Sequence, residues 1–264
     1  MPFDKRTIES AATGTDNYVS VFVPDVDRPV FPVMYFLHGL GDNSDTVWEK
    51  TGLYALAEEH ELIIVSADAE SGWYCNDRRD GRNILWEDFF AFELPSFIEE
   101  NYPASKKRRG RGLCGFSMGG YGALMLALRH GGRFAAASSI SGSVCFGHEF
   151  REDRPERTEF MKAVAPPGGE YDLFAAASSV SESASAAGDG AAGASAGVAD
   201  IPSLMIEVGL GDHLLEHNRR LRAHLDVCGI GHVYAEHEGG HDWTFVGKRL
   251  HSSMDFLTRE LPVF

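Results

Sequence analysis

A serine flanked by glycines is the clearest chemical signal in this sequence. Residues 115–119 read Gly-Phe-Ser-Met-Gly, so Ser117 has a glycine two positions away on each side. This G-x-S-x-G spacing is typical of a strained turn between a strand and a helix, where larger side chains would clash. Since an apolar strand is expected before the turn and a helix (123–128) after it, we predict that Ser117 is a nucleophile on a nucleophile elbow.

A serine hydroxyl needs a general base, and the C-terminal part of the sequence offers one. His241 lies in a glycine-rich loop (EGGHDW) between the last expected strand and an amphipathic helix. Asp212 follows the strand expected at 204–208, so the chain order is Ser, Asp, His, as in α/β-hydrolases. We expect His241 to act as the base and Asp212 to orient its ring and stabilise the imidazolium. Glu207 and Asp242 are competing acids, but the first lies inside the strand and the second is adjacent to His241.

Two backbone amides are expected to form an oxyanion hole. The strand expected at 33–37 leads directly into His-Gly-Leu-Gly-Asp. In α/β-hydrolases such a loop donates one amide, and the residue after the nucleophile donates the other. Here these amides would belong to Leu40 and Met118. We expect His38 to be a structural hydrogen-bonding residue rather than a base.

Three aromatic residues, Trp73, Tyr74 and Trp243, are candidates for substrate binding. They lie on loops near the expected ends of strands, where a pocket would open. Core packing is the alternative role for each of them.

Two histidine patterns resemble zinc-peptidase motifs. His237 and His241 match H-E-x-x-H, and His213 and His217 match H-x-x-E-H. The first motif works only on a helix, and its two interior glycines oppose helix formation. The second lacks an obvious third protein ligand. A zinc metalloprotein using His213 and His217 is therefore the less favoured alternative, and we expect neither a metal nor another cofactor.

The elements that must position these residues alternate between strands and helices. Apolar residues at helical spacing follow Asp212 and recur near the C-terminus. Such alternation predicts an α/β-hydrolase fold, with a mostly parallel central sheet flanked by helices on both faces, in a single domain spanning residues 1–264. Short apolar runs closed by Gly, Asp or Pro predict strands at 18–23, 33–37, 62–67, 112–116, 134–140, 204–208 and 233–236.

One region departs from this pattern. We expect residues 143–200 to form a cap or loop region, within which residues 175–200 are almost entirely Ala, Ser and Gly. Such a composition buries too little apolar surface to offset the entropy of ordering, which predicts a mobile loop. A passive surface insertion and a functional lid are the two interpretations of this segment.

Charge and composition exclude several classes of partner. The net charge is −15, which opposes binding to nucleic acid. The one basic run, at 106–111, is short, and we expect it to be a solvent-exposed segment before a strand rather than a nucleic-acid site. No apolar run is close to the length of about 20 residues that a membrane span requires. Residues 1–20 also lack the apolar core of a signal peptide. The four cysteines show no C-x-x-C spacing. We expect a cytoplasmic protein with reduced cysteines and no membrane partner. The sequence leaves open whether the protein forms a homo-oligomer.

Several segments together resemble the esterase D/antigen 85-like branch of the α/β-hydrolases. They are GFSMGGYGAL, LHGLGD, GLGDHLLEHNR and EGGHDW, and the resemblance extends from Tyr18 to Leu257. This branch includes tributyrin-type esterases, S-formylglutathione hydrolases, feruloyl and acetyl-xylan esterases and mycolyltransferases. Its members carry an ordinary helix where this chain has residues 178–199.

The resemblance implies a serine hydrolase, specifically a carboxylesterase that acts on short-chain acyl esters of small molecules. Its catalytic triad would be Ser117, Asp212 and His241, and the reaction would pass through an acyl-enzyme intermediate. An S-formylglutathione-type thioesterase and a carbohydrate esterase, acetyl or feruloyl, are the alternatives within the branch.

Overall fold

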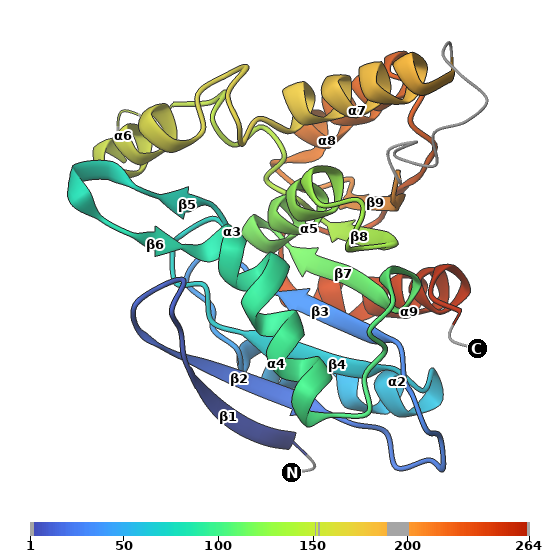
Figure 1. Cartoon of the computed structure of the whole chain (residues 1–264). Helices are drawn as coiled ribbons and strands as arrows, with labels where there is room; N and C mark the ends of the chain where they lie inside the picture. The colour runs from blue at the N-terminus through green and yellow to red at the C-terminus, as the bar shows by residue number, and fades with distance from the viewer. Residues whose placement is uncertain (1–2, 151, 153, 189–200, 263–264) are drawn as a thin grey trace.

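The computed structural model describes residues 3–150, 152, 154–188 and 201–262 of the chain. An eight-stranded sheet forms its centre (Figure 1). In spatial order its strands are β1 (Phe3–Glu9), β2 (Asp16–Phe22), β4 (Ile63–Ala67), β3 (Val33–Leu37), β7 (Arg111–Phe116), β8 (Ala136–Ile140), β9 (Ser203–Gly209) and β10 (His232–His237). The strands from β4 to β10 pair in parallel, whereas β2 is antiparallel to both β1 and β4. The predicted α/β fold with a mostly parallel sheet is confirmed.

Strand β1 is the one strand of this sheet that the sequence pattern does not predict. Three consecutive charged residues, Asp4, Lys5 and Arg6, interrupt the alternation of apolar and polar residues that identifies a strand. Most of β1 is not buried. Such a sequence suits an edge strand, because a charged edge opposes further pairing with other chains.

Helices cover both faces of the sheet. On one face lie α4 (Leu94–Asn101), α5 (Met118–Arg129), α7 (Leu173–Gly188) and α8 (Leu215–Val227). On the other lie α1 (Thr46–Lys50), α2 (Leu53–Glu59) and α9 (Trp243–Glu260). The side chains of β3 alternate between the two layers and are all buried, which explains its uninterrupted apolar sequence.

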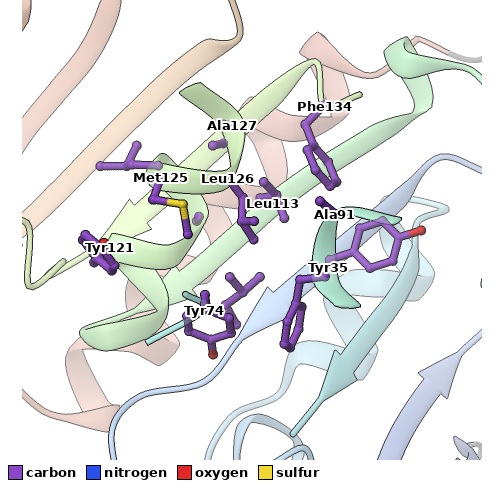
Figure 2. Packing of buried hydrophobic residues seen from close by; sticks show 14 of the residues in the cluster. Tyr35, Tyr74, Ala91, Leu113, Tyr121, Met125, Leu126, Ala127 and Phe134 are labelled. Carbon is purple, nitrogen blue, oxygen red and sulfur yellow. The ribbon is translucent and has the colours of Figure 1, made fainter. Parts of the chain in front are cut away.

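The packing of α5 against the sheet supports the turn that carries Ser117. Figure 2 shows Leu126 of α5 beside Leu113 of β7; Met125 of α5 and Tyr35 of β3 belong to the same buried cluster. All four are fully buried. Since interiors are close-packed and respond poorly to changes in volume, this contact fixes α5 against the sheet.

The other elements are short or lie outside the sheet. They are a two-stranded ribbon of β5 (Asn76–Asp77) and β6 (Ile84–Leu85), α3 (Trp86–Asp88), the π-helical turn η2 (Phe89–Glu93), the 3₁₀ turns η1 (Arg79–Gly81) and η3 (Arg108–Gly110), and α6 (Pro155–Val164). Figure 1 shows α6 apart from the other helices, at the side of the molecule to which the arrows of β3 and β7 point.

The prediction of a mobile loop from residue 175 is wrong for residues 175–188, which belong to α7. Alanine is the strongest helix former and loses no side-chain entropy, so an Ala-rich run orders easily once it can pack. The helix packs against α5 and α8, with Ala177 fully buried. Asp172 caps it by accepting a hydrogen bond from the Phe174 amide at 2.9 Å. The rest of the predicted loop, 189–200, lies outside the described residues.

The basic run before β7 is only partly solvated. Lys106, Lys107 and Arg109 are exposed, but Arg111 is buried, contrary to expectation. Arg111 donates to the Glu99 carboxylate at 2.5 Å, which balances its charge inside the protein. The cysteines are all free thiols. Among the described residues, no helix is both long and apolar enough to span a membrane.

Candidate active site

Ser117 lies where β7 ends and α5 begins. Its backbone has a φ of 56° and a ψ of −112°, a left-handed φ that is unusual for a residue other than glycine. A Cβ atom on Gly115 would collide with the Gly119 carbonyl, and one on Gly119 would collide with the Leu37 carbonyl. The two glycines of the motif therefore allow the strand, the turn and the helix to approach closely enough to strain Ser117.

Ser117, His241 and Asp212 form a continuous chain of hydrogen bonds. The Ser117 Oγ atom is 2.9 Å from His241 Nε2, and His241 Nδ1 is 2.9 Å from Asp212 Oδ2. Because an ionised carboxylate can only accept, the proton of the neutral ring belongs on Nδ1, which leaves Nε2 to accept from the serine hydroxyl. The three residues follow β7, β10 and β9, whose carboxyl ends meet at one edge of the sheet.

The carboxyl group of Asp212 is fully shielded from solvent. Burial alone would raise its pKa, but hydrogen bonds, led by that of His241 and including the Leu214 amide at 2.8 Å, outweigh burial and lower the pKa below 3.8. Asp212 is therefore ionised at neutral pH. A fixed carboxylate in this position can hold the imidazole in one tautomer and stabilise its protonated form.

The His241 ring contacts two other aromatic rings. The centroid of Phe116 is 4.8 Å away at an interplanar angle of 35°, and that of His213 is 4.7 Å away at 68°. Trp243 in turn packs edge-on against Phe116, with centroids 5.3 Å apart. These contacts restrict the imidazole to the orientation in which it reaches both of its hydrogen-bond partners.

The loop after β3 is fixed by buried hydrogen bonds. His38 Nε2 accepts from the Ala69 amide at 2.9 Å, so Nδ1 carries the proton and donates to the Gly39 carbonyl at 2.8 Å. The Tyr74 hydroxyl donates to the His38 carbonyl at 2.9 Å. Burial lowers the pKa of His38, which keeps the ring neutral. His38 is thus a structural anchor for the loop, in agreement with the sequence-based interpretation.

The expected oxyanion donors lie at the start of α5 and in the loop fixed by His38. Met118 is the first residue of α5, where an amide has no acceptor within the helix. Leu40 lines the same cavity as Ser117. The positive end of the α5 dipole also lies at this position. These placements are compatible with a role for both amides in stabilising negative charge beside Ser117.

The three aromatic candidates for substrate binding lie in different places. Trp73 lines the cavity and stacks on Phe146, with ring centroids 3.9 Å apart. Tyr74 is instead fully buried, and Trp243 packs behind Phe116, so neither lines the cavity. For these two residues the core-packing alternative describes their surroundings. Trp73 and Tyr74 both have a positive φ, so their directions could not be inferred from strand alternation.

A cavity of about 300 Å³ opens at Ser117 and His241. The segment after β8 and the helix α6 supply much of its wall, including Phe146, Arg154, Arg157 and Met161. These residues could not be predicted from the sequence, because α6 carries no catalytic motif. The available signal was Pro155, whose position at the start of a helix is favoured.

The first zinc-like pattern is not helical. His237 belongs to β10, and its Nε2 atom is 2.9 Å from Glu207 Oε1. Glu207 is itself buried in β9 and also accepts from Ser252 at 2.7 Å. These bonds explain both why His237 does not share a helix face with His241 and why Glu207 does not act as its acid.

The second zinc-like pattern separates into two environments. His217 Nε2 is 2.8 Å from Glu149, whereas His213 lies beside His241. Within the described parts of the chain, the one group with ligand atoms close enough to share a metal ion is Asp212, His213 and His241, within 4.8 Å of one another. Because Asp212 and His241 already bond each other within the chain to Ser117, this grouping favours a triad over the less favoured zinc alternative at His213 and His217.

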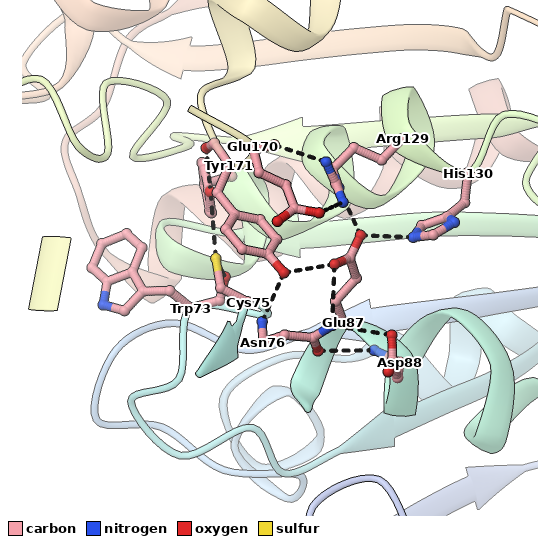
Figure 3. Close-up of polar contacts among 10 residues, drawn as sticks. Trp73, Cys75, Asn76, Glu87, Asp88, Arg129, His130, Glu170 and Tyr171 are labelled. Carbon is pink, nitrogen blue, oxygen red and sulfur yellow. Dashed lines mark hydrogen bonds and ion pairs between the residues drawn. The ribbon is translucent and has the colours of Figure 1, made fainter. Parts of the chain in front are cut away.

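A second buried polar cluster stabilises the segment that carries Trp73 (Figure 3). Glu87 accepts hydrogen bonds from Arg129 at 2.6 Å and from Tyr171 at 2.7 Å, and lies 2.8 Å from His130 Nε2. The Asn76 amide donates to the Tyr171 hydroxyl at 3.1 Å. Burial raises the pKa of Glu87, but these partners outweigh it and lower the pKa to about 2. The cluster thereby ties β5, α3 and the end of α5 together.

Proteins of related sequence are esterases by name. An esterase of Mycobacterium tuberculosis (strain H37Rv) is 36% identical over 150 residues, covering 54% of this chain and 32% of that protein. The chain thus matches about a third of the length of that relative. An acetyl esterase of Caldicellulosiruptor saccharolyticus is 25% identical over 265 residues, covering 97% of this chain and 94% of the relative.

The fold is also shared with solved structures. An S-formylglutathione hydrolase of Staphylococcus aureus superposes with a TM-score of 0.79 at 22% identity, covering 97% of this chain and 98% of the other. The family model Esterase, described as "Putative esterase", matches residues 10–256. This match includes every residue of the hydrogen-bonded chain described above and confirms the resemblance inferred from the sequence. The chain therefore belongs to the Esterase family and has the α/β-hydrolase fold.

Proposed function

We propose that this chain is a serine carboxylesterase that hydrolyses short-chain acyl esters of small molecules. The observation that carries the proposal is the hydrogen-bonded chain from Ser117 through His241 to Asp212 at the wall of a cavity. Membership of the Esterase family supports an ester as the substrate, and similarity to an acetyl esterase along nearly the whole chain supports a short acyl group.

In the acylation step the Ser117 hydroxyl attacks the ester carbonyl while His241 Nε2 accepts its proton. Asp212 stabilises the resulting imidazolium without taking the proton itself. The amides of Leu40 and Met118 are the proposed donors to the oxyanion of the tetrahedral intermediate. Collapse of this intermediate breaks the bond to the alcohol oxygen, which receives the proton from His241 and leaves.

Deacylation repeats these steps with water as the nucleophile. His241 removes a proton from a water molecule, which attacks the acyl carbonyl bound to Ser117. The second tetrahedral intermediate collapses, the acid is released and Ser117 recovers its proton from His241. The cycle needs no group other than the proposed triad, the two amides and water.

The test is turnover of 4-nitrophenyl acetate and butyrate by the wild type and by Ser117→Ala. We expect kcat to fall by at least about 10⁴-fold in the variant, since loss of the nucleophile leaves only binding and electrostatic effects. Circular dichroism and thermal unfolding should show that the variant is folded. Ser96→Ala is the control, because Ser96 is an exposed serine of α4 whose hydroxyl donates to the Phe92 carbonyl of the preceding turn η2. Equal turnover by wild type and Ser117→Ala would refute the proposal.

A thioester is the second candidate substrate. The S. aureus protein with this fold is an S-formylglutathione hydrolase, and attack by a serine on a thioester uses the same groups. A carbohydrate acetyl ester is a third candidate. Assays of S-formylglutathione and of acetylated xylan beside the nitrophenyl esters would rank the three by kcat/KM.

A further inference from the structure

Asn218 is a buried polar residue of α8 that the proposed mechanism does not use. Its side chain is fully shielded from solvent. The amide nitrogen Nδ2 donates to two backbone carbonyls, that of Leu214 at 2.9 Å and that of Gly142 at 3.0 Å. Because carbonyl oxygens only accept, the nitrogen of the amide and not its oxygen must face them. Asn218 therefore joins two segments that are far apart in the sequence.

The first of these segments carries the acid of the proposed triad. Leu214 ends the loop after β9, and α8 begins at the next residue. The Leu214 amide donates to Asp212 Oδ1 at 2.8 Å, and the Leu215 amide donates to the Asp212 carbonyl at 3.1 Å. The other carboxylate oxygen, Oδ2, bonds His241. By binding the Leu214 carbonyl, Asn218 thus fixes the residue whose amide holds the Asp212 carboxylate.

The second segment holds the backbone of the nucleophile. It consists of the three residues after β8, which we call the β8 loop (141–143). The Ser141 amide donates to a carbonyl of β9 at 2.7 Å, and the Ser143 amide donates to the Ser117 carbonyl at 2.9 Å. Asn218 binds the carbonyl of the middle residue. The β8 loop is therefore fixed to β9, to α8 and to the turn of the nucleophile by three consecutive residues.

What Asn218 contributes is its two donors and not its acceptor. Its Oδ1 atom is buried and has no hydrogen-bond partner among the residues that the structure describes. A buried acceptor without a partner reduces stability. The two donors, in contrast, connect the segment of Asp212 with that of Ser117. These two residues must both stay within 2.9 Å of the His241 ring, and a displacement of about 1 Å in such an arrangement can cost about 10²-fold in rate.

We propose that Asn218 is a positioning residue of the triad, which aligns the segment of Asp212 with that of Ser117 through its two amide hydrogens. The inference rests on the proposed esterase function and adds a residue to the groups that perform it. Asn218 does not line the cavity, so it acts through Asp212 and Ser117 and not on the substrate.

Asn218→Leu tests the proposal, because leucine has a similar shape but no donor. We expect kcat for 4-nitrophenyl butyrate to fall by about 10–100-fold with little change in KM, since the lost alignment matters in the transition state. Circular dichroism and thermal unfolding measure folding. Asn17→Leu is the matched control, the same substitution at a buried asparagine of β2 that donates to Thr13 Oγ1 at 2.9 Å. This control should lower Tm and retain the kcat of the wild type.

A double variant separates positioning from a general loss of stability. In Asp212→Asn the triad is already disabled, and the activity that is left no longer depends on its alignment, because the members of a triad act as a unit. Addition of Asn218→Leu to Asp212→Asn should therefore change kcat by less than about threefold. A fall as large as the one that Asn218→Leu causes in the wild type would overturn the positioning role.

Asn218→Ser keeps the test decisive if the leucine variant does not fold. A hydroxyl has a single hydrogen, so it cannot serve both carbonyls, and kcat should fall by at least about tenfold. A folded Asn218 variant with the kcat of the wild type would overturn the inference and leave the esterase function intact. Failure of the wild type to hydrolyse any ester, together with a Ser117 that resists phosphonates, would instead refute the proposed function and the inference with it.

Discussion

Asp212 and Glu87 are both buried carboxylates that pair with a histidine, and the two regions differ in what the histidine contacts next. Asp212 bonds His241, whose other ring nitrogen is 2.9 Å from the Ser117 hydroxyl at a cavity. Glu87 bonds His130 and also binds Arg129 (Figure 3), and it does not line that cavity. Both carboxyl groups have a lowered pKa.

The comparison shows that a depressed pKa and a histidine partner do not by themselves identify chemistry. Around Glu87 the hydrogen bonds converge on the carboxylate and neutralise it, as in a structural ion pair. Around Asp212 the hydrogen bonds continue through His241 to Ser117, a strained serine with a positive φ. What separates the two sites is that the hydrogen bonds at Asp212 continue through His241 to a nucleophile, whereas those at Glu87 end on the carboxylate.

The largest expected effect comes from Asp212→Asn. The amide can no longer hold His241 in the required tautomer, so we expect kcat for 4-nitrophenyl butyrate to fall by about 10⁴-fold with little change in stability. Steady-state kinetics and thermal unfolding measure the two quantities. A loss of less than about tenfold in kcat would contradict the role of Asp212 as the orienting acid.

Glu87→Gln should show the opposite behaviour. It leaves Arg129 partly unpaired inside the protein, so we expect the free energy of unfolding to fall by about 3 kcal/mol and Tm by roughly 6–10 °C. The loss of kcat should be far smaller than in Asp212→Asn. Urea titration and the same ester assay make the comparison, and a catalytic defect as severe as that of Asp212→Asn would place Glu87 in the reaction.

The Glu87 cluster should also give stability a pH dependence. The pKa of Glu87 is about 2 in the folded protein, below the ordinary value of 4.5. A carboxyl group with a lowered folded pKa stabilises the protein above its unfolded pKa, and this contribution is lost as the pH falls from about 4.5 towards 2. Glu87→Gln should therefore lose less stability than the wild type over that range. Parallel curves for the two proteins would contradict the role of Glu87.

Tyr171→Phe should have the smallest effect. The variant removes one hydroxyl, which donates to Glu87 and accepts from the Asn76 amide, so we expect a destabilisation of about 1–2 kcal/mol. A change in KM without a change in kcat would indicate that the cluster also positions Trp73 in the cavity wall. Thermal unfolding and the substrate dependence of the ester assay distinguish these effects.

The residues of the hydrogen-bonded chain could be predicted because local sequence determines their positions. Gly115 and Gly119 are required by the close contacts of the turn, and parallel strands bring their carboxyl ends together. The cavity wall could not be predicted in this way. Arg154 and Arg157 reach Ser117 through the tertiary placement of α6, which no local pattern specifies. For Tyr74, substrate binding and core packing could not be distinguished from the sequence, because a positive φ in the loop turns the side chain into the core.

Composition was a poor guide to α7. The Ala, Ser and Gly content of residues 175–188 buries little apolar surface, but alanine has a high helix propensity and small side chains permit close packing. The Ser181 hydroxyl, for example, donates to the Cys228 carbonyl of the neighbouring segment at 2.6 Å. The sequence signal for the start of this helix is Asp172, which caps it.

The central claim is that His241 activates Ser117, and covalent labelling tests it most directly. A serine-directed fluorophosphonate reacts only with a serine that an adjacent base makes nucleophilic. Incubation of the wild type followed by peptide mass spectrometry should give one adduct per chain, on Ser117, and no adduct in His241→Ala. An unmodified Ser117, or a label on a different residue, would contradict the account.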